Sequence, residues 1–436
     1  MSHAIFKSRR AQLLDIIKRT MPEKTGSIFL WAGESFDHQL FVQDSSFYYF
    51  TGINEPGVVL QLMLDGKTRL FIPNTQGRRV QWVSQTYDTS RESCVRAGVD
   101  EIVSMGDPIT GYYRVPLCAE RDAHFLLDVL REAKASGVIF TPVPDGSYAL
   151  SQYISWNAVS RFIPDIFDAF VDIRNAIASL RRTKDEHELA LIMHAVQITQ
   201  AAHADVAHAL EDGVSERMLQ AHIAATLTMF GSDYAYAPMV AAGASSALPH
   251  YELNTGVVRS GDIVMVDCGA RFEHYCADIT RTYPVDGTFS KRQLEVYETV
   301  FACQELLASL AKPGMYLSNS EIPELSLYHQ AQEFFKKRDL DTYIVHGIGH
   351  FLGLDVHDVS VAGAPLQEGD VITIEPGLYL PQEKFGVRIE DDYLLVKDGA
   401  YSLSDDLPKK CDDLYKLLSE RDQACDTCCS SECHHH

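Results

Sequence analysis

The sequence has no uninterrupted apolar run that approaches the roughly 20 residues of a membrane-spanning helix. It is also short of positive charge, because 38 Lys and Arg face 60 Asp and Glu and give a formal net charge of −22. Such an acidic chain repels the phosphate backbone of nucleic acids. We therefore expect no membrane partner and no nucleic-acid partner. The charge fits an enzyme that attracts cations or cationic peptide termini.

Residues 1–20 lack the apolar core of a secretory signal peptide. Apolar Phe6 and Leu13 are interleaved with charged Arg9 and Asp15, which is typical of an amphipathic helix of the folded protein. A mitochondrial presequence is the alternative, although such presequences are poor in acidic residues. We expect a cytoplasmic protein.

A disulfide framework is not indicated either. Most of the ten cysteines are scattered through apparently structured sequence, which is typical of reduced, mostly buried thiols. The others crowd beside three histidines at the end of the chain: Cys425, Cys428, Cys429 and Cys433. Cys425 and Cys428 have zinc-ligand spacing, but no second pair lies at a usual distance. We predict a disordered tail over residues 416–436, with a metal or redox element as the alternative.

The 436 residues, of which 46% are hydrophobic, provide enough apolar side chains for the cores of two or three domains. In the first part, strand-like segments at 27–33 and 58–64 alternate with helix-like segments such as 121–137. This alternation predicts an α/β domain over residues 1–171.

The pattern changes at Asp172, where an almost continuously helical stretch begins and runs to Glu211. From Val257 onward strand-like sequence dominates, broken by one helical stretch over residues 291–310. We therefore predict a second domain, with both helices and strands, over residues 172–415.

Two pairs of carboxylates lie in strand-like sequence that doubles back on itself. If each segment forms a hairpin symmetric about its midpoint, Asp267 lies directly opposite Asp278, and Glu375 directly opposite Glu390. Their Cβ atoms would be about 5 Å apart. Facing like charges destabilise a sheet by up to roughly 1 kcal/mol, so two such pairs in apolar surroundings indicate a bound cation. Solvated surface carboxylates are the alternative.

Three histidines, His346, His350 and His357, lie between the two acidic segments in a glycine-rich apolar stretch. Glycines allow a backbone to approach a site closely and to adopt positive φ. A single histidine is usually structural, but three of them beside paired carboxylates indicate metal ligands or acid–base groups.

Four carboxylates and one neutral imidazole carry a charge that two divalent cations neutralise. Oxygen-rich ligation favours Mn²⁺, with Co²⁺, Fe²⁺ or Zn²⁺ as alternatives. Two metals about 3.5 to 4 Å apart lower the pKa of a bridging water and stabilise a tetrahedral intermediate, as in hydrolases. A dinuclear phosphoesterase shares this chemistry, but the net charge of −22 argues against a phosphate substrate.

Several segments together resemble the metallopeptidases of the pita-bread fold, which include methionine aminopeptidase, aminopeptidase P, prolidase and creatinase. They are VDCG and ADITRT within 266–282, HGIGHFLGLDVHD at 346–358, TIEPG at 373–377 and GVRIEDD at 386–392. The resemblance implies a creatinase-like N-terminal α/β domain followed by a catalytic pita-bread domain. It also implies five metal ligands, of which Asp278 and Glu390 bridge both ions: Asp267, Asp278, His350, Glu375 and Glu390.

The same resemblance implies roles for further residues. Glu375 would shuttle a proton as well as bind metal, and Arg388 would orient active-site groups. The implied catalytic residues are His250, His346, His357, Glu375 and Arg388. The implied substrate-binding residues are Tyr236, His250, His346 and His357.

Segments 44–56 and 350–358 most resemble the aminopeptidase P and prolidase branch. The implied reaction removes the N-terminal residue from peptides with proline in second position. Aminopeptidase P accepts long peptides and prolidase only dipeptides; the chain length and segment 47–56 favour the former. One departure is that Phe41, Val42 and Gln43 precede Asp44, where many relatives have an arginine.

Relatives in this branch form homodimers or homotetramers, so the resemblance also implies a homo-oligomer. Other relatives have lost metal ligands and serve as binding modules. A non-catalytic pita-bread binding protein is therefore the remote alternative, and the complete ligand set argues against it.

Overall fold

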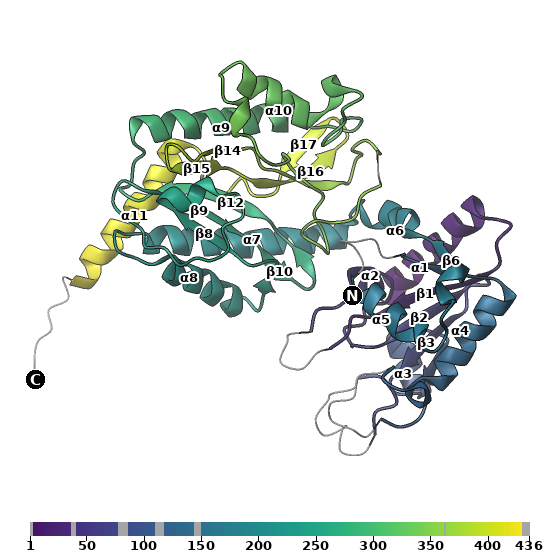
Figure 1. Cartoon of the computed structure of the whole chain (residues 1–436). Helices are drawn as coiled ribbons and strands as arrows, with labels where there is room; N and C mark the ends of the chain where they lie inside the picture. The colour runs from purple at the N-terminus through teal and green to yellow at the C-terminus, as the bar shows by residue number, and fades with distance from the viewer. Residues whose placement is uncertain are drawn as a thin grey trace, which may run out of the picture. The chain divides into compact units, whose positions relative to one another are not determined.

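The computed structural model describes residues 3–35, 41–76, 86–109, 117–143, 150–361 and 363–429. The chain forms two compact units, Met1–Arg181 and Arg182–His436, and each contains both helices and strands (Figure 1). The predicted mixed α/β class is confirmed. In the described ranges, no helix is both long and apolar enough to span a membrane.

The first unit contains a six-stranded mixed sheet. Its strands in spatial order are β4 (Glu101–Ser104), β3 (Thr68–Ile72), β2 (Val59–Met63), β1 (Gly26–Trp31), β5 (Val138–Thr141) and β6 (Phe170–Asp172). β2 pairs antiparallel with β1 and β3, whereas β4, β5 and β6 each join a neighbour in parallel. The strands expected at 27–33 and 58–64 are present, since both are runs of mostly buried residues.

The helices of the first unit are α1 (His3–Thr20), α2 (Ser45–Thr51), α3 (Arg91–Ala97), α4 (His124–Ser136), α5 (Leu150–Ser160) and α6 (Arg174–Arg181). α1 is the predicted amphipathic helix and buries Leu13 and Ile17. α4 is the helix expected over 121–137. α6 belongs to this unit, because Tyr49 Oη donates to Leu180 O at 3.0 Å. The unit therefore ends after α6, whereas the sequence placed the boundary before it.

The departure before Asp44 has a structural role inside the first unit. Gln43 is buried, accepts from Gly33 N at 2.7 Å and donates to Ile53 O at 3.0 Å. Asp44 caps α2 by accepting from Phe47 N at 2.8 Å. Gln43 and Asp44 therefore stabilise the connection between β1 and β2 within their own unit.

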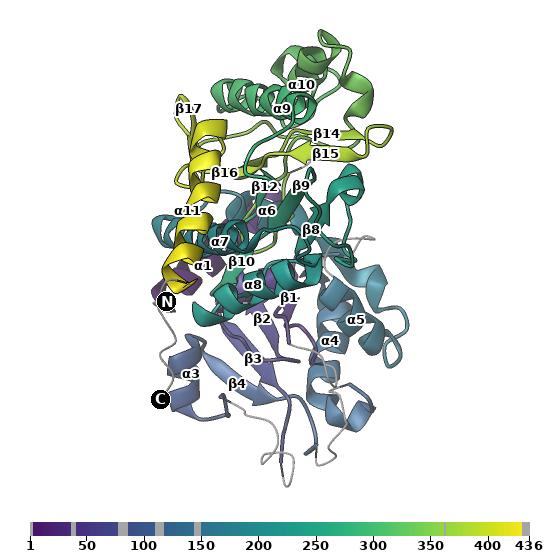
Figure 2. The same ribbon diagram turned by 90° about the vertical axis from the view of Figure 1, so that its left-hand side faces the viewer.

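In the second unit, strands lie between the helix pair α7–α8 and the helix pair α9–α10 (Figures 1 and 2). The helices are α7 (Glu186–Ala209), α8 (Glu216–Met229), α9 (Lys291–Leu310), α10 (Leu327–Lys336) and α11 (Cys411–Cys429). The strands are β7 (Asp233–Tyr234), β8 (Met239–Ala242), β9 (Ile263–Cys268), β10 (Ala270–Phe272), β11 (Tyr275–Cys276), β12 (Ile279–Pro284), β13 (Val371–Ile374), β14 (Gly377–Leu380), β15 (Phe385–Arg388), β16 (Asp391–Val396) and β17 (Gly399–Ser402).

The helical stretch expected from Asp172 to Glu211 is interrupted between α6 and α7. Asp185 accepts from Glu188 N at 2.9 Å, and the Glu188 side chain accepts from Asp185 N at 3.1 Å. This capping box starts a new helix.

The expectation of one helical stretch beyond Val257 was wrong. α10 begins after Ser326, whose hydroxyl caps it, and it buries Leu327, Ala331 and Phe335. This spacing of four residues repeats on one helix face, so the signal was present in the sequence.

The C-terminal segment is helical further than expected. α11 reaches Cys429 and covers the start of the predicted tail, because Leu414 and Leu418 anchor its first turns in the core. Cys433 and the final histidines lie outside the described residues. The cysteines described elsewhere in the chain are free, and Cys268, Cys276 and Cys303 are buried.

The hairpin of β9 and β12 has a different register from the predicted one. Thr280, and not Asp278, lies opposite Asp267. The turn is centred on Glu273 and His274, which both adopt positive φ, at 44° and 75°. The prediction placed this centre one residue earlier, and a two-residue turn of this kind sets the register. Asp278 still shares a face with Asp267, as its diagonal neighbour.

The second acidic hairpin has the predicted register. The ladder of β13 with β16 and the ladder of β14 with β15 continue one register across Glu375 and Glu390, which therefore face each other. A β-bridge between Thr280 and Glu390 joins the two hairpins. All four carboxylates are thereby brought into one region of the second unit.

Candidate metal centre

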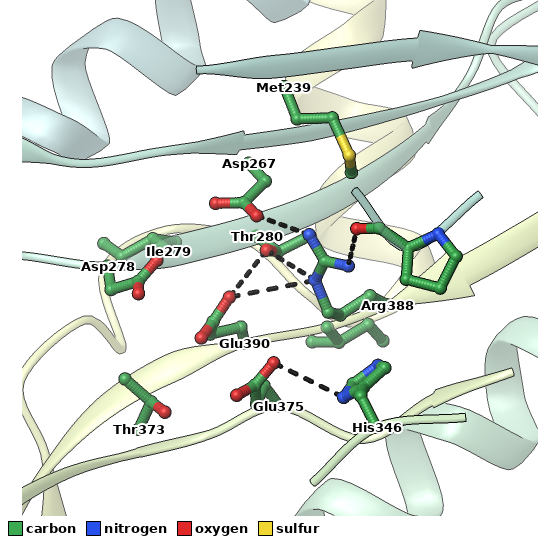
Figure 3. Close-up of polar contacts among 12 residues, drawn as sticks. Met239, Asp267, Asp278, Ile279, Thr280, His346, Thr373, Glu375, Arg388 and Glu390 are labelled. Atoms are coloured by element: carbon green, nitrogen blue, oxygen red, sulfur yellow. Dashed lines mark hydrogen bonds and ion pairs between the residues drawn. The ribbon is translucent and has the colours of Figure 1, made fainter. Parts of the chain in front are cut away.

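Three of the five candidate ligands form a tight group. One oxygen of Asp278, one oxygen of Glu390 and a ring nitrogen of His350 lie within 4.8 Å of one another. His350 Nε2 is 3.3 Å from Asp278 Oδ2 and 3.8 Å from Glu375 Oε1. Figure 3 shows the carboxylates of Asp267 and Glu375 on two sides of Glu390. The structure thus brings the five predicted residues together.

Burial and neighbouring charge oppose the ionisation of three carboxylates of this group, Asp267, Glu375 and Glu390. Burial, followed by the charge of Asp278, raises the pKa of Glu390 well above its usual range. Burial also raises the pKa of Asp267 and raises that of Glu375 to about 7. Burial alone would lower the pKa of His350, but the hydrogen bond to Asp278 and nearby negative charges outweigh it and raise it to about 9. A divalent cation fits this oxygen-rich donor set, because it allows the ligands to deprotonate.

Arg388 on β15 lies among these side chains, and Figure 3 shows its guanidinium between Asp267 and Glu390. It forms an ion pair with Asp267, and its Nε is 3.9 Å from Glu390 Oε2. It also donates to Thr280 Oγ1 at 3.0 Å and to Tyr379 Oη at 2.7 Å. A buried guanidinium with partners on several strands holds those strands in register with one another.

Tyr236 lies just before β8 and reaches the first hairpin. Its hydroxyl is 2.5 Å from Asp267 Oδ1 and also within hydrogen-bonding distance of Asp278. Burial and the surrounding carboxylates raise the pKa of Tyr236 well above its usual value. The hydroxyl therefore keeps its proton and donates to one carboxylate at a time.

His346 lies beside Glu375 (Figure 3). Its Nδ1 is 3.7 Å from Glu375 Oε2, and its Nε2 is 2.8 Å from Tyr379 Oη. Burial, and then the charge of Arg388, lowers the pKa of His346 to about 4. The imidazole is therefore neutral near pH 7.

His357 stacks on His350, with ring centroids 4.0 Å apart and planes inclined by 10°. Burial, followed by the charge of His350, lowers the pKa of His357. His250 is exposed on a loop of the same unit.

Sequence analysis missed three residues of the site, Thr280, Tyr379 and Asp392. Thr280 Oγ1 donates to Glu390 Oε2 at 2.7 Å, and Asp392 Oδ2 accepts from Asp278 N at 3.1 Å. Thr280 and Asp392 each follow a candidate ligand by two residues, and strand periodicity places such residues on one face. That signal could have found them, whereas nothing local in the sequence distinguishes Tyr379.

Comparisons with known proteins match this architecture. The sequence profile of metallopeptidase family M24 matches residues 190–397, and that of the aminopeptidase P N-terminal domain matches residues 6–108. The chain is 31% identical to Xaa-Pro aminopeptidase 3 of Rattus norvegicus, over 87% of this chain and 77% of that protein. It is 30% identical to the Xaa-Pro aminopeptidase of Haemophilus influenzae, over 87% of this chain and 89% of the relative.

The chain therefore belongs to metallopeptidase family M24, a family that binds divalent metal ions. The solved structure of E. coli aminopeptidase P with the inhibitor Pro-Leu aligns with a TM-score of 0.78 at 25% identity and covers 97% of this chain and 99% of that chain. Within the pita-bread fold, the chain belongs to the aminopeptidase P branch.

Proposed function

We propose that this protein is an Xaa-Pro aminopeptidase, which removes the N-terminal residue from peptides with proline in second position. The observation that carries this proposal is the group of Asp278, His350 and Glu390, with Asp267 and Glu375 beside it. The names of the two relatives support the substrate class. We assign the catalysis to the second unit.

We propose that two divalent ions bind to this centre, where the five predicted ligands would hold them. Mn²⁺ is the ion that the oxygen-rich donors favour. A structure of the E. coli relative is described as zinc-substituted, which supports the inclusion of Zn²⁺, beside Co²⁺ and Fe²⁺, among the alternatives. When bound, the ions supply a nucleophilic water and stabilise negative charge.

Glu375 is proposed to move the proton. Its carboxylate lies beside His346 and His350, where it would accept a proton from the attacking water and return it to the leaving proline nitrogen. His357 would donate a hydrogen bond to the oxygen on which negative charge develops. His346 has its Nδ1 2.5 Å from Gly347 O and its Nε2 2.8 Å from Tyr379 Oη, so it would exchange one of these partners to donate to the same oxygen.

Substrate binding is proposed to use both charge and shape. The free amino terminus of the peptide would lie near the carboxylates, which restricts cleavage to the first residue. His250 and Tyr236 would contact the substrate beside the scissile bond. Proline has no N–H and a fixed φ, so its site must recognise the ring by shape.

The test compares two substrates with the Mn²⁺-loaded protein. Release of the first residue from a longer Xaa-Pro-Xaa peptide is the expected result, and excess chelator should abolish it until Mn²⁺ or Co²⁺ is added. Hydrolysis of Gly-Pro alone would make the protein a prolidase. Cleavage of neither, with both metals bound, would overturn the proline assignment.

We also propose at least a homodimer, on the resemblance to dimeric and tetrameric relatives, and a cytoplasmic location. Light scattering at micromolar concentration should give a mass of two or four chains. A monomer would contradict the assembly, and cell fractionation tests the location.

A further inference from the structure

The segment that carries His250 has no regular secondary structure of its own. It runs from the end of the short 3₁₀ turn Gly243–Ala247 to the β-bridge at Val257. His250 is exposed on it, as are Leu248 and Leu253. A loop with few internal backbone hydrogen bonds needs anchors to hold one side chain in a fixed position.

Glu216, in the first turn of α8, provides such an anchor. It is only 1% exposed, and its carboxylate accepts three hydrogen bonds. The donors are Ala242 N at 2.9 Å, Tyr251 Oη at 2.9 Å and Gly256 N at 2.6 Å. One carboxylate thus ties together the strand before the loop, the residue next to His250 and the end of the loop.

The approach of Gly256 to Glu216 leaves no room for a side chain. A Cβ at this position would lie 2.7 Å from Glu216 Oε1. Asn254 supports the same segment in a left-handed conformation with φ 48°, accepting from Val240 N at 2.9 Å and donating to Pro238 O at 2.8 Å. The other side of the loop is held by Arg388, which donates to Pro249 O at 3.3 Å.

The chemistry at Glu216 requires an acid. A carboxylate accepts at both oxygens, whereas the amide of glutamine has one acceptor oxygen and an NH₂ group. In a Glu216→Gln variant, the NH₂ group faces either Ala242 N–H or Gly256 N–H, and a buried donor is left without its acceptor.

We propose that Glu216 is a positioning residue for substrate binding: it fixes the loop 248–257 so that His250 faces the peptide at the metal centre. This inference rests on the proposed function, because it takes His250 as a substrate contact. Glu216 acts through Tyr251 and Gly256 and touches none of the five proposed ligands, so its effect is separate from metal binding.

The experiment compares Glu216→Gln, His250→Ala and the double variant in the full-length, Mn²⁺-loaded protein. Glu216→Gln should raise KM for a Xaa-Pro-Xaa peptide about tenfold, with kcat changed less than about threefold and bound metal unchanged. The double variant should be no worse than His250→Ala alone, because both remove one interaction. Tyr251→Phe removes a single donor and should give a smaller rise.

Hydrogen exchange provides a readout that needs no activity. Amides of residues 248–257 should exchange at least about tenfold faster in Glu216→Gln, and those of α7 should not change. Glu211→Gln, an exposed glutamate just after α7, is the matched control and should resemble the parent in both measurements. If Glu216→Gln does not fold, Glu216→Asp and Tyr251→Phe provide the same comparison.

The outcomes separate the two proposals. An unchanged exchange rate in the loop, loss of metal in Glu216→Gln, or fully additive effects in the double variant would overturn the role of Glu216. Absence of any peptidase activity in the parent would overturn the proposed function, while the exchange result would still decide whether Glu216 anchors the loop.

Discussion

The hairpin β9–β12 and the hairpin that contains β13 to β16 each contribute two carboxylates, but they balance the charge differently. In the first, Asp267 has an ion pair with Arg388, and Tyr236 donates to the carboxylates. In the second, Glu375 and Glu390 face each other, and Arg388 reaches Glu390 only at 3.9 Å. The second pair therefore depends more on a bound cation for its charge balance.

The largest expected effect comes from Asp278→Asn, which removes an anion from the tight group. We expect loss of at least one metal ion and a fall in kcat beyond the roughly 100-fold typical of a lost supporting residue. Elemental analysis and steady-state kinetics measure both. Asp398→Asn, at an exposed turn before β17, is the control. Full activity of the parent in excess chelator would remove the dinuclear interpretation.

The next effect separates the histidines. His350→Ala should reduce metal content, because its ring nitrogen belongs to the tight group. His346→Ala and His357→Ala should retain metal but lower kcat on the order of 10²-fold, since they would stabilise transition-state charge. Equal metal loss in all three variants would contradict this division of roles.

A smaller effect compares the hydroxyl groups that donate to the carboxylates of the two hairpins. Thr280→Val removes the donor to Glu390 and should weaken metal binding about tenfold, the usual result of an unsatisfied buried partner. Tyr236→Phe should cost less, because Arg388 still balances Asp267. Metal titration of both variants decides the order, and a larger loss in Tyr236→Phe would reverse the comparison between the hairpins.

A pH effect on stability is expected from His203, which lies behind the first hairpin. His203 is fully buried between Tyr283 Oη, at 3.1 Å, and Ile279 O, at 3.0 Å, and burial lowers its pKa from 6.5 to about 3. The folded protein holds it neutral, whereas the unfolded chain protonates it below pH 6.5. Its contribution to stability is therefore present above pH 6.5 and is lost as the pH falls, by about 1.4 kcal/mol per unit.

Urea unfolding between pH 7.5 and 5 measures this dependence. His203→Gln removes the titrating group, so its stability should fall less steeply with decreasing pH. His208→Gln, on the exposed side of α7, is the control. Equal slopes in the parent and His203→Gln would exclude this residue as a source of acid sensitivity.

The smallest expected effect is that of the C-terminal segment. Deletion of residues 425–436 should leave turnover and metal content unchanged, because the five proposed ligands are complete without it. A marked loss of either would show that the cysteines and histidines there are part of a functional element.

The two hairpins also show where sequence reasoning succeeds. The register of the second hairpin could be predicted by assuming two arms of equal length, because the loop after Leu380 lies at the midpoint between Glu375 and Glu390. The register of the first hairpin could not be predicted in this way, because its turn is formed by Glu273 and His274 with positive φ. Neither residue type indicates such a conformation in the sequence. Thr280 could have been found by strand periodicity, whereas Glu216 lies far from the motifs it supports.

Sequence patterns alone were enough to identify the residue types of the site, the two acidic hairpins, the histidine segment between them and, through these motifs, the family. Such features are local, because strand periodicity and short spacings decide which side chains share a face. The three-dimensional fold was needed to show that Arg388 pairs with Asp267, that Thr280 joins the two hairpins and that Glu216 binds the loop of His250. These contacts join segments far apart in the chain, and long-range packing sets them, which no local pattern encodes.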